Sequence, residues 1–194
     1  MAHVFLDMTQ SLDGYTCGPD ISVEHPLGRG GGPLHAWLFG DEAGPPDDLD
    51  REIAGELFAG TGAFLIGRRT FDVGIGEWGE DGAFGRPCFV VTHRPRAMLT
   101  VGPTTFAFVT DGIESALAQA RAAAGDQNVC VMGGGELAAQ YLRAGLIDQL
   151  RLHLAHLLLG QGGRLFDGVG VGALRATRAV QTRLATHLRF ELRP

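Results

Sequence analysis

The chain has 194 residues, of which 45% are hydrophobic, so it is long enough for one full core and too short for two ordinary domains. We therefore expect one domain over residues 1–194. Its net charge is −6, and the absence of a basic stripe with interleaved aromatic residues argues against nucleic-acid binding. All 16 basic residues are arginine, which excludes Schiff-base chemistry and a Walker phosphate loop, since both need a lysine.

The chain does not open with an apolar run of the length that a signal peptide or a membrane span needs, so we expect a cytoplasmic protein with no membrane contact. Its cysteines, Cys17, Cys88 and Cys130, are odd in number, and the last two lie in strand-like runs. They are typical of reduced core residues, not of a disulfide framework. No pair of them has metal-ligand spacing, so we expect no metal site.

Hydrophobic periodicity predicts an alternation of strands and helices along the chain. We expect strands at residues 4–9, 63–66, 87–92, 104–109, 128–132, 150–155, 174–182 and 184–193. We expect helices at residues 47–59, 70–75, 110–124, where Thr110 and Asp111 form the cap, and 136–144. Two loops rich in glycine or charge, 13–46 and 76–86, are expected to lie over a site.

This order predicts an α/β fold. We expect a single three-layer α/β/α domain, in which a central mixed, mostly parallel sheet ends in a C-terminal antiparallel hairpin. In the first strand, Val4, Leu6 and Met8 share one face, and Asp7 lies on the other.

The strand before residue 133 runs into three glycines and then a helix. Gly133, Gly134 and Gly135 carry no Cβ, so backbone N–H groups can close on a phosphate at the positive end of the helix. A tight strand–helix turn that uses the free φ of glycine is the equal alternative.

Two further strands also end in groups that suit an anion. The first is followed by Gly67, Arg68, Arg69 and Thr70, and the planar fork of arginine matches phosphate oxygens. The second ends in residues 92–94, Thr-His-Arg. Because open α/β sheets bind ligands beyond the carboxyl ends of their strands, the three turns predict a pyrophosphate and one further phosphate, as in NADP.

These motifs, in this order, resemble the dihydrofolate reductase-like superfamily. Residues 8–14, 146–150 and 157–166 resemble the reductase (RibD C-terminal) domain of riboflavin biosynthesis, and the resemblance covers about residues 3–192. It implies a stand-alone relative of that domain, which binds NADPH. The cofactor-binding residues that it implies are Met8, Thr9, Thr16, Gly67, Arg68, Arg69, Thr70, Thr92, His93, Arg94, Met132, Gly133, Gly134, Gly135 and Glu136.

Several acidic residues are candidates for the proton donor or for an anchor of the substrate. Asp13 matches the aspartate of the Ser-Leu-Asp-Gly motif, or forms an Asx turn before Gly14. Asp7 lies in an apolar strand, where a carboxylate is costly without a partner. Asp50 and Glu52 fall in the helix that carries the pterin-binding acid of dihydrofolate reductases, or lie on its solvated face. We take Asp13, Asp7 and Glu52 as catalytic candidates and Asp50 as a substrate contact.

Three more residues are candidates for substrate binding. In dihydrofolate reductases an arginine at the offset of Arg86 holds the glutamate carboxylate of folate, although an exposed arginine is the simpler interpretation. Trp37 and Trp78 lie in the two expected loops and would stack on a flat heterocycle, or pack within a lid.

Together these features predict an NADPH-dependent reductase that acts on a pterin-like, aminopyrimidine-type or other small conjugated heterocycle. The alternative is a nucleotide-binding protein with little or no catalysis, acting as a sensor or sequestering a ligand. We also expect a homodimer, because the run 150–158 indicates a long apolar strand that a partner would cover, as the resemblance implies for this part of the sheet.

Overall fold

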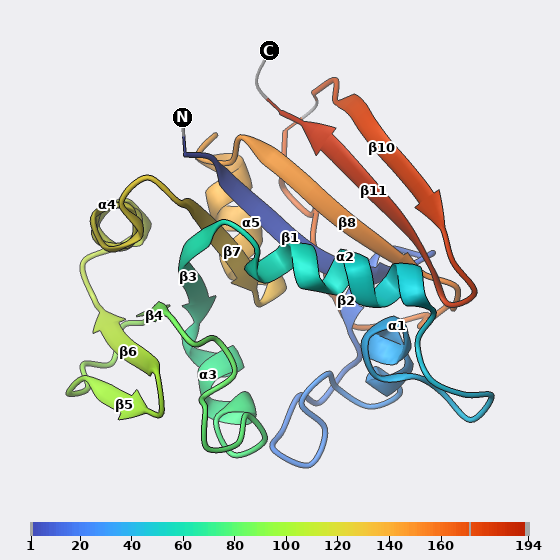
Figure 1. Ribbon diagram of the computed structural model, residues 1–194, viewed down its shortest axis with the longest axis horizontal. Helices are drawn as coiled ribbons and strands as arrows, with labels where there is room; N and C mark the ends of the chain where they lie inside the picture. Colours follow the sequence, from blue (N-terminus) through green and yellow to red (C-terminus); the bar gives the residue numbers. More distant parts are fainter. Residues whose placement is uncertain (1, 171, 193–194) are drawn as a thin grey trace.

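The computed structural model describes residues 2–170 and 172–192. Its large sheet contains β1 Val4–Ser11, β3 Thr61–Gly67, β4 Pro87–Val91, β5 Leu99–Val101, β6 Thr104–Val109, β7 Asn128–Gly133, β8 Gln149–Ala155, β10 Arg175–Gln181 and β11 Ala185–Glu191. The strand order is β10-β11-β8-β1-β7-β3-β4-β6-β5 (Figure 1). Two short strands, β2 Tyr15–Cys17 and β9 Gly163–Arg164, form a separate antiparallel pair.

The central strands β8, β1, β7, β3, β4 and β6 run parallel, and β5 pairs antiparallel with β6. At the other side, β11 pairs antiparallel with both β8 and β10. The expected mixed, mostly parallel sheet with a C-terminal antiparallel hairpin is therefore confirmed. Because the central strands are parallel, their carboxyl ends meet at one edge of the sheet.

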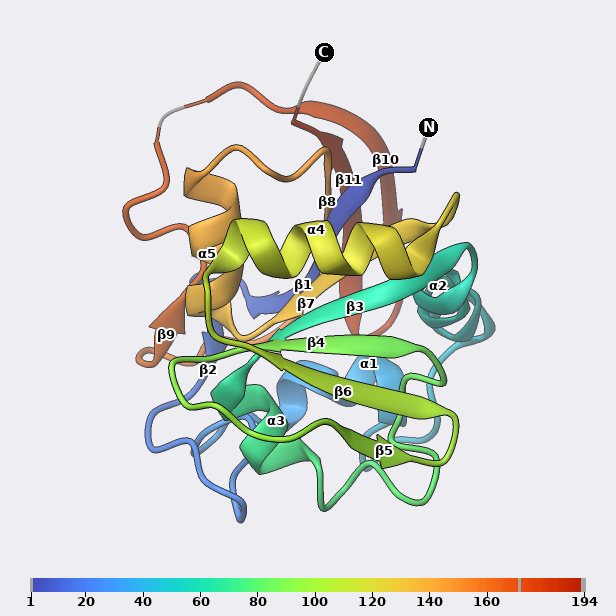
Figure 2. The same ribbon diagram turned by 90° about the vertical axis from the view of Figure 1, so that its left-hand side faces the viewer.

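Helices cover both faces of this sheet. They are η1 Gly32–His35, α1 Ala36–Phe39, α2 Asp48–Phe58, α3 Arg68–Gly74, α4 Ile113–Ala124 and α5 Gly135–Arg143. Helices α4 and α5 lie against one face, and α1, α2 and α3 lie against the other (Figures 1 and 2).

The alternation of β1 decides which residues meet which layer. Val4, Leu6 and Met8 pack into the core shared with α4 and α5, whereas Phe5 packs with Phe71 of α3 on the opposite side. The two-faced strand predicted for this segment is confirmed. Asp7, on the same side as Phe5, consequently points toward the layer that contains α1 and α2.

The segment expected as one loop over residues 13–46 is partly regular. It contains β2, η1 and α1, and Pro33 stands at the start of η1, where its missing N–H costs nothing. These elements are three or four residues long, which is too short for a periodic pattern to show. The same reason explains why β5 and β9 were not predicted.

Two helix starts differ from the prediction. Helix α3 begins at Arg68 and not at residue 70, and α4 begins at Ile113 with Gly112 as its N-cap. The predicted cap by Thr110 and Asp111 is wrong, because the Asp111 carboxylate accepts a hydrogen bond from the Ser115 hydroxyl instead of from the first backbone N–H groups.

The run 150–158 is not an uncovered strand. Strand β8 ends at Ala155 and is paired on both sides, by β1 and β11. Leu150 and Leu152 are buried within the chain, so they do not call for a partner. The edge strand on this side is β10, whose Arg175 and Arg178 carry the charges that keep edges from pairing. The homodimer stays a prediction.

The part of the chain that the structure describes has no helix both long and apolar enough for a membrane span. Its three cysteines are free thiols, as predicted, and burial raises the pKa of Cys88 and of Cys130.

Candidate active site

A cleft of about 1840 Å³ opens where the parallel strands end. Its lining contains almost the whole set predicted to contact the cofactor, and Gly133 is the exception. The members of that set in the lining are Met8, Thr9, Thr16, Gly67, Arg68, Arg69, Thr70, Thr92, His93, Arg94, Met132, Gly134, Gly135 and Glu136. The structure thus brings four distant segments into one cleft, while their contact with a cofactor stays a prediction.

The glycine turn lies in close contact with neighbouring side chains. A Cβ on Gly134 would stand 3.3 Å from Thr70 Oγ1, and a Cβ on Gly135 would stand 2.7 Å from Thr16 Oγ1. Gly133 has a φ of 118°, which favours glycine, and lies against Met8. Any side chain here would fill the space above the first backbone groups of α5. The turn is therefore a cradle that fits a pyrophosphate at a helix N-terminus.

The two arginines predicted for a further phosphate converge, but an acid lies between them. Asp72 bonds the Arg68 Nε atom at 2.8 Å and the Arg94 Nη2 atom at 2.9 Å. The Thr92 hydroxyl oxygen accepts a hydrogen bond from the Arg94 backbone N–H at 3.0 Å. Sequence analysis missed Asp72, although it lies four residues after Arg68 on one helix face. A phosphate at this end of the cleft would meet guanidinium groups that are already partly neutralised.

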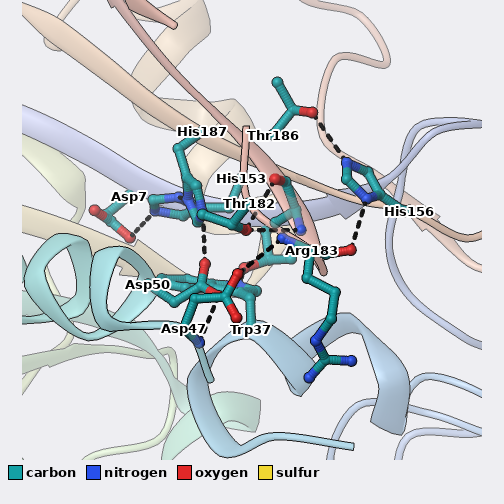
Figure 3. Close-up of polar contacts among 12 residues, drawn as sticks. Asp7, Trp37, Asp47, Asp50, His153, His156, Thr182, Arg183, Thr186 and His187 are labelled. Atoms are coloured by element: carbon teal, nitrogen blue, oxygen red, sulfur yellow. Dashed lines mark hydrogen bonds and ion pairs between the residues drawn. The ribbon is translucent and has the colours of Figure 1, made fainter. Parts of the chain in front are cut away.

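Four side chains form a buried series of hydrogen bonds at the other end of the cleft, which we call the polar chain: Asp7, His153, His187 and Asp50 (Figure 3). Asp7 Oδ1 lies 3.1 Å from His153 Nε2, and the two Nδ1 atoms of the histidines are 2.7 Å apart. The series ends with His187 Nε2, at 2.9 Å from Asp50 Oδ1.

Strand register explains why these groups meet. His153 of β8 lies opposite Thr9 of β1 on one side and opposite His187 of β11 on the other. Their side chains share the face that α1 and α2 cover. Both histidines are only 3% and 4% exposed, and neither is among the predicted site residues. Polar residues at alternate positions of two adjacent strands were the available signal.

Trp37 of α1 packs against both histidines of the polar chain. Its ring centroid lies 4.3 Å from that of His153 and 5.0 Å from that of His187, and its Nε1–H donates to Thr9 Oγ1 at 3.0 Å. Trp37 also lines the cleft, so the predicted position at the pocket holds. However, it belongs to a helix that packs on the sheet and not to an irregular lid.

The two acids predicted on α2 differ in their surroundings. Asp50 is fully buried, and its second carboxylate oxygen accepts from the Asp47 N–H in the capping box of α2. Glu52 is exposed and lies outside the lining of the cleft. The helix turns the Glu52 side chain to solvent, so its catalytic role stays a prediction that no position in the cleft supports.

Asp13 has a structural role. Its carboxylate accepts hydrogen bonds from the Ser11 hydroxyl at 2.5 Å and from the backbone N–H groups of Leu159 and Gly160 at 3.1 and 2.7 Å. The Ser11 hydroxyl, more than any other group, lowers the pKa of Asp13 to about 2, so it stays ionised near neutral pH. These bonds tie the segment after β8 to the segment after β1, and the catalytic role of Asp13 stays a prediction.

The remaining substrate candidates, Trp78 and Arg86, differ in their distance from the cleft. Trp78 borders the cleft, but its ring stacks on Phe106 with centroids 5.8 Å apart and serves mainly as core. Arg86 precedes β4 and thus lies at the amino end of a parallel strand, opposite the edge that carries the cleft. Its Nη2 atom is 3.5 Å from the Phe58 carbonyl oxygen. The structure does not bring Arg86 to the cleft.

His35 is the last residue of η1 and lines the cleft close to the polar chain. Burial is the main cause that lowers the pKa of His35 to about 4, and the nearby His153 acts in the same direction. Burial also lowers the pKa of His187. Burial therefore favours the neutral form of His35 and of His187. One end of the cleft carries groups that suit an anion, and the other carries titratable side chains. This arrangement suits a reaction that adds a hydride and a proton.

The sequence is similar to one protein family and to one protein named for riboflavin biosynthesis. The profile of the RibD C-terminal domain family matches residues 2–191. A riboflavin biosynthesis protein RibD from Corynebacterium ammoniagenes is 27% identical over 198 residues, which cover 95% of this chain and 52% of the relative. The chain thus spans about half the length of this relative.

Solved structures show the same fold at low identity. A protein assigned to riboflavin biosynthesis from Shewanella sp. PV-4 superposes with a TM-score of 0.74 at 19% identity and covers 99% of both chains. A pyrimidine reductase-like protein from Corynebacterium diphtheriae gives 0.60 at 12% identity, over 100% of this chain and 92% of the other. Dihydrofolate reductase from Enterococcus faecalis, complexed with NADP(H), gives 0.59 at 15% identity, over 97% and 95%. The predicted dihydrofolate reductase-like fold is confirmed.

Proposed function

The chain belongs to the RibD C-terminal domain family, and we propose that it is an NADPH-dependent reductase of a small heterocycle. The family and the fold support a reductase of this kind. NADPH use, the pterin-like or aminopyrimidine-type substrate and the assembly are parts of the proposal.

One observation carries the proposal: a single cleft joins a glycine cradle, an arginine cluster and a partly buried acid, Asp7. The cradle at Gly134 and Gly135 would hold the pyrophosphate through backbone N–H groups, since the two glycines leave the approach open. Arg68 and Arg94 would hold the 2′-phosphate of the cofactor. NADPH, when bound, supplies the hydride.

The other end of the cleft supports a heterocyclic substrate. Asp7 offers a carboxylate that is 12% exposed, and its neighbours Trp37 and His35 also line the cleft. A carboxylate beside aromatic rings recognises a flat ring that presents N–H donors on its edge, as pterins and aminopyrimidines do. A polar group placed in this way fixes the orientation of such a ring.

The test is a direct assay of purified protein. We expect NADPH oxidation that depends on 5-amino-6-(5-phosphoribosylamino)uracil or on 7,8-dihydrofolate, with NADH as the matched control cofactor. Tight NADPH binding without turnover of either compound, or of a wider panel of pterins and pyrimidines, would contradict the enzyme and favour the non-catalytic nucleotide-binding alternative.

The homodimer is also part of the proposal. The support that the structure leaves is an exposed apolar pair, Leu12 and Leu158, on segments joined by a 3.0 Å hydrogen bond from the Leu12 N–H to the Leu157 carbonyl. Light scattering at micromolar concentration should give about twice the chain mass of 20.6 kDa. A monomer mass would remove the dimer from the proposal and leave the reductase in place.

A further inference from the structure

The polar chain has a proton count that its geometry dictates. It contains three hydrogen bonds in series, and each of them needs one hydrogen. Two neutral histidines carry two hydrogens on their rings, and two ionised carboxylates carry none. Between the Nδ1 atoms, 2.7 Å apart, there is room for one hydrogen and not for two. The polar chain is therefore fully bonded with one proton more than neutral histidines and carboxylates supply.

That additional proton has equivalent positions along the series. With Asp50 protonated, hydrogens lie on Asp50 Oδ1, His187 Nδ1 and His153 Nε2, and Asp7 is ionised. When each hydrogen moves across its own bond, Asp50 becomes the carboxylate and Asp7 becomes the acid. Every contact is kept, and the heavy atoms can stay in place. The distances thus allow a proton to pass from one end of the polar chain to the other.

The two ends differ in what they face. Asp50 belongs to α2 and is fully buried. Asp7 lines the large cleft and also a small cavity of about 20 Å³ beside the histidines, which is space for about one water molecule. The wall of this cavity includes Glu56 and Arg178, whose side chains are partly exposed. Protons can consequently leave toward the cleft and return from the surface.

We propose that the polar chain is the proton source of the reaction and that Asp7 is its outlet. The Asp7 acid turns the O–H group of Oδ1, whose hydrogen the series has supplied, from His153 into the cleft and gives this hydrogen to the basic atom of a substrate. The O–H bond breaks, its electron pair stays on Asp7, and a bond from hydrogen to the substrate forms. The polar chain is then left with two neutral histidines and two carboxylates, and a proton that enters from solvent through water in the small cavity restores the additional proton. This inference rests on the proposed reductase function.

Asp7 is a catalytic residue in this proposal, and His153, His187 and Asp50 are positioning residues. Charged and titratable groups from every neighbouring element surround the polar chain, and they set the pH at which it loses its proton. These groups are Cys130 of β7, Arg151 of β8, Arg178 of β10, Arg189 of β11, Glu56 of α2, Asp47 before α2, His35 of η1 and Arg183 between β10 and β11.

The shared proton is testable in the protein without ligands. Nitrogen-15 NMR of the histidine rings should show one downfield, slowly exchanging hydrogen coupled to an Nδ1 atom. The signal should vanish in His187→Gln and persist in His156→Gln, a matched control whose exposed ring bonds Thr186 and Arg183. Both Nδ1 atoms without hydrogen in the parent protein would overturn the proposal, and this readout needs no variant that folds.

Proton delivery is tested by kinetics with the same proteins. We expect Asp7→Asn to lower kcat about 10²–10⁴-fold with NADPH affinity unchanged. His187→Gln should move the alkaline limb of the pH profile, and His156→Gln should match the parent. A parent protein without turnover overturns the proposed function. A parent protein that turns over, with Asp7→Asn at equal kcat and the same pH profile, overturns proton delivery alone.

Discussion

The two ends of the cleft use different kinds of interaction. The glycine–arginine end, as we call it, consists of the segments 67–70, 92–94 and 132–135, where backbone groups and guanidinium groups follow directly from strand ends. The polar chain consists of single residues from β1, β8, β11 and α2, and its histidines are almost fully buried. Exposed side chains at the first end, such as that of Arg94, can be changed without disturbing a core. Each group in the polar chain is also part of the packing between the sheet and α2.

This difference leads to two kinds of sensitivity. At the glycine–arginine end, water can solvate the exposed groups that a substitution leaves unpaired, so the cost should appear as lost affinity. In the polar chain, a removed partner leaves a buried group unsatisfied, so the cost should appear as lost stability. The following experiments test that contrast.

The largest effect is expected at the buried end of the polar chain. Asp50→Ala removes the partner of His187 and of the Asp47 N–H, so the free energy of unfolding should fall by about 3–5 kcal/mol. Urea denaturation measures this change. The control is Asp48→Ala on the same helix, whose side chain is 98% exposed and which should stay within about 0.5 kcal/mol. Equal effects of the two variants would remove the contrast.

Acid should destabilise the same region. The pKa of His35 is lowered from 6.5 to about 4, so between these pH values the unfolded chain binds a proton that the folded chain does not. Stability therefore rises with pH across this window, and lowering the pH from 6.5 to 4 should cost about 1–3 kcal/mol. Denaturation at a series of pH values gives the slope. His35→Gln should flatten it, and an unchanged slope in that variant would assign the effect to other groups.

At the glycine cradle, affinity should change without stability. Gly134→Val places a branched side chain beside Thr70 and across the approach to the backbone, so NADPH affinity should fall at least about tenfold. Titration calorimetry measures affinity, and circular dichroism checks the fold. Gly55→Val is the control, because a Cβ there meets nothing within 4 Å. Unchanged NADPH affinity in Gly134→Val would mean that the turn is only structural.

The smallest effect is expected at the arginine cluster. Arg94 is 68% exposed and already paired with Asp72, so Arg94→Ala should weaken NADPH binding about 3–10-fold and leave NADH binding unchanged. Asp72→Asn provides the opposite change: it frees both arginines and should strengthen NADPH binding a few-fold. Equal affinities of the parent protein for NADH and NADPH would show that this cluster does not read the 2′-phosphate.

The same contrast explains which residues could be predicted. The glycine turn and the residues 67–70 and 92–94 are contiguous motifs, and almost all of them line the cleft as expected. Asp7 was identified because an acid in an apolar strand needs a partner, but the partner itself was not. Asp13, Glu52 and Arg86 were selected because of a motif, a helix and an offset, respectively, that resemble those of known families. In the fold, Asp13 bonds backbone N–H groups, Glu52 faces solvent, and Arg86 contacts the Phe58 carbonyl.

The order of the elements, the mostly parallel sheet and the end of the sheet at which the cleft opens follow from length, periodicity and glycine content. These properties depend on neighbours within a few residues, which interact whatever the rest of the chain does. Three features are visible only in the folded chain. Asp72 lies between two arginines, β8 is paired on both sides, and two histidines join Asp7 to Asp50. These contacts span up to 146 positions of the chain and arise from strand register and from the seat of α2 on the sheet.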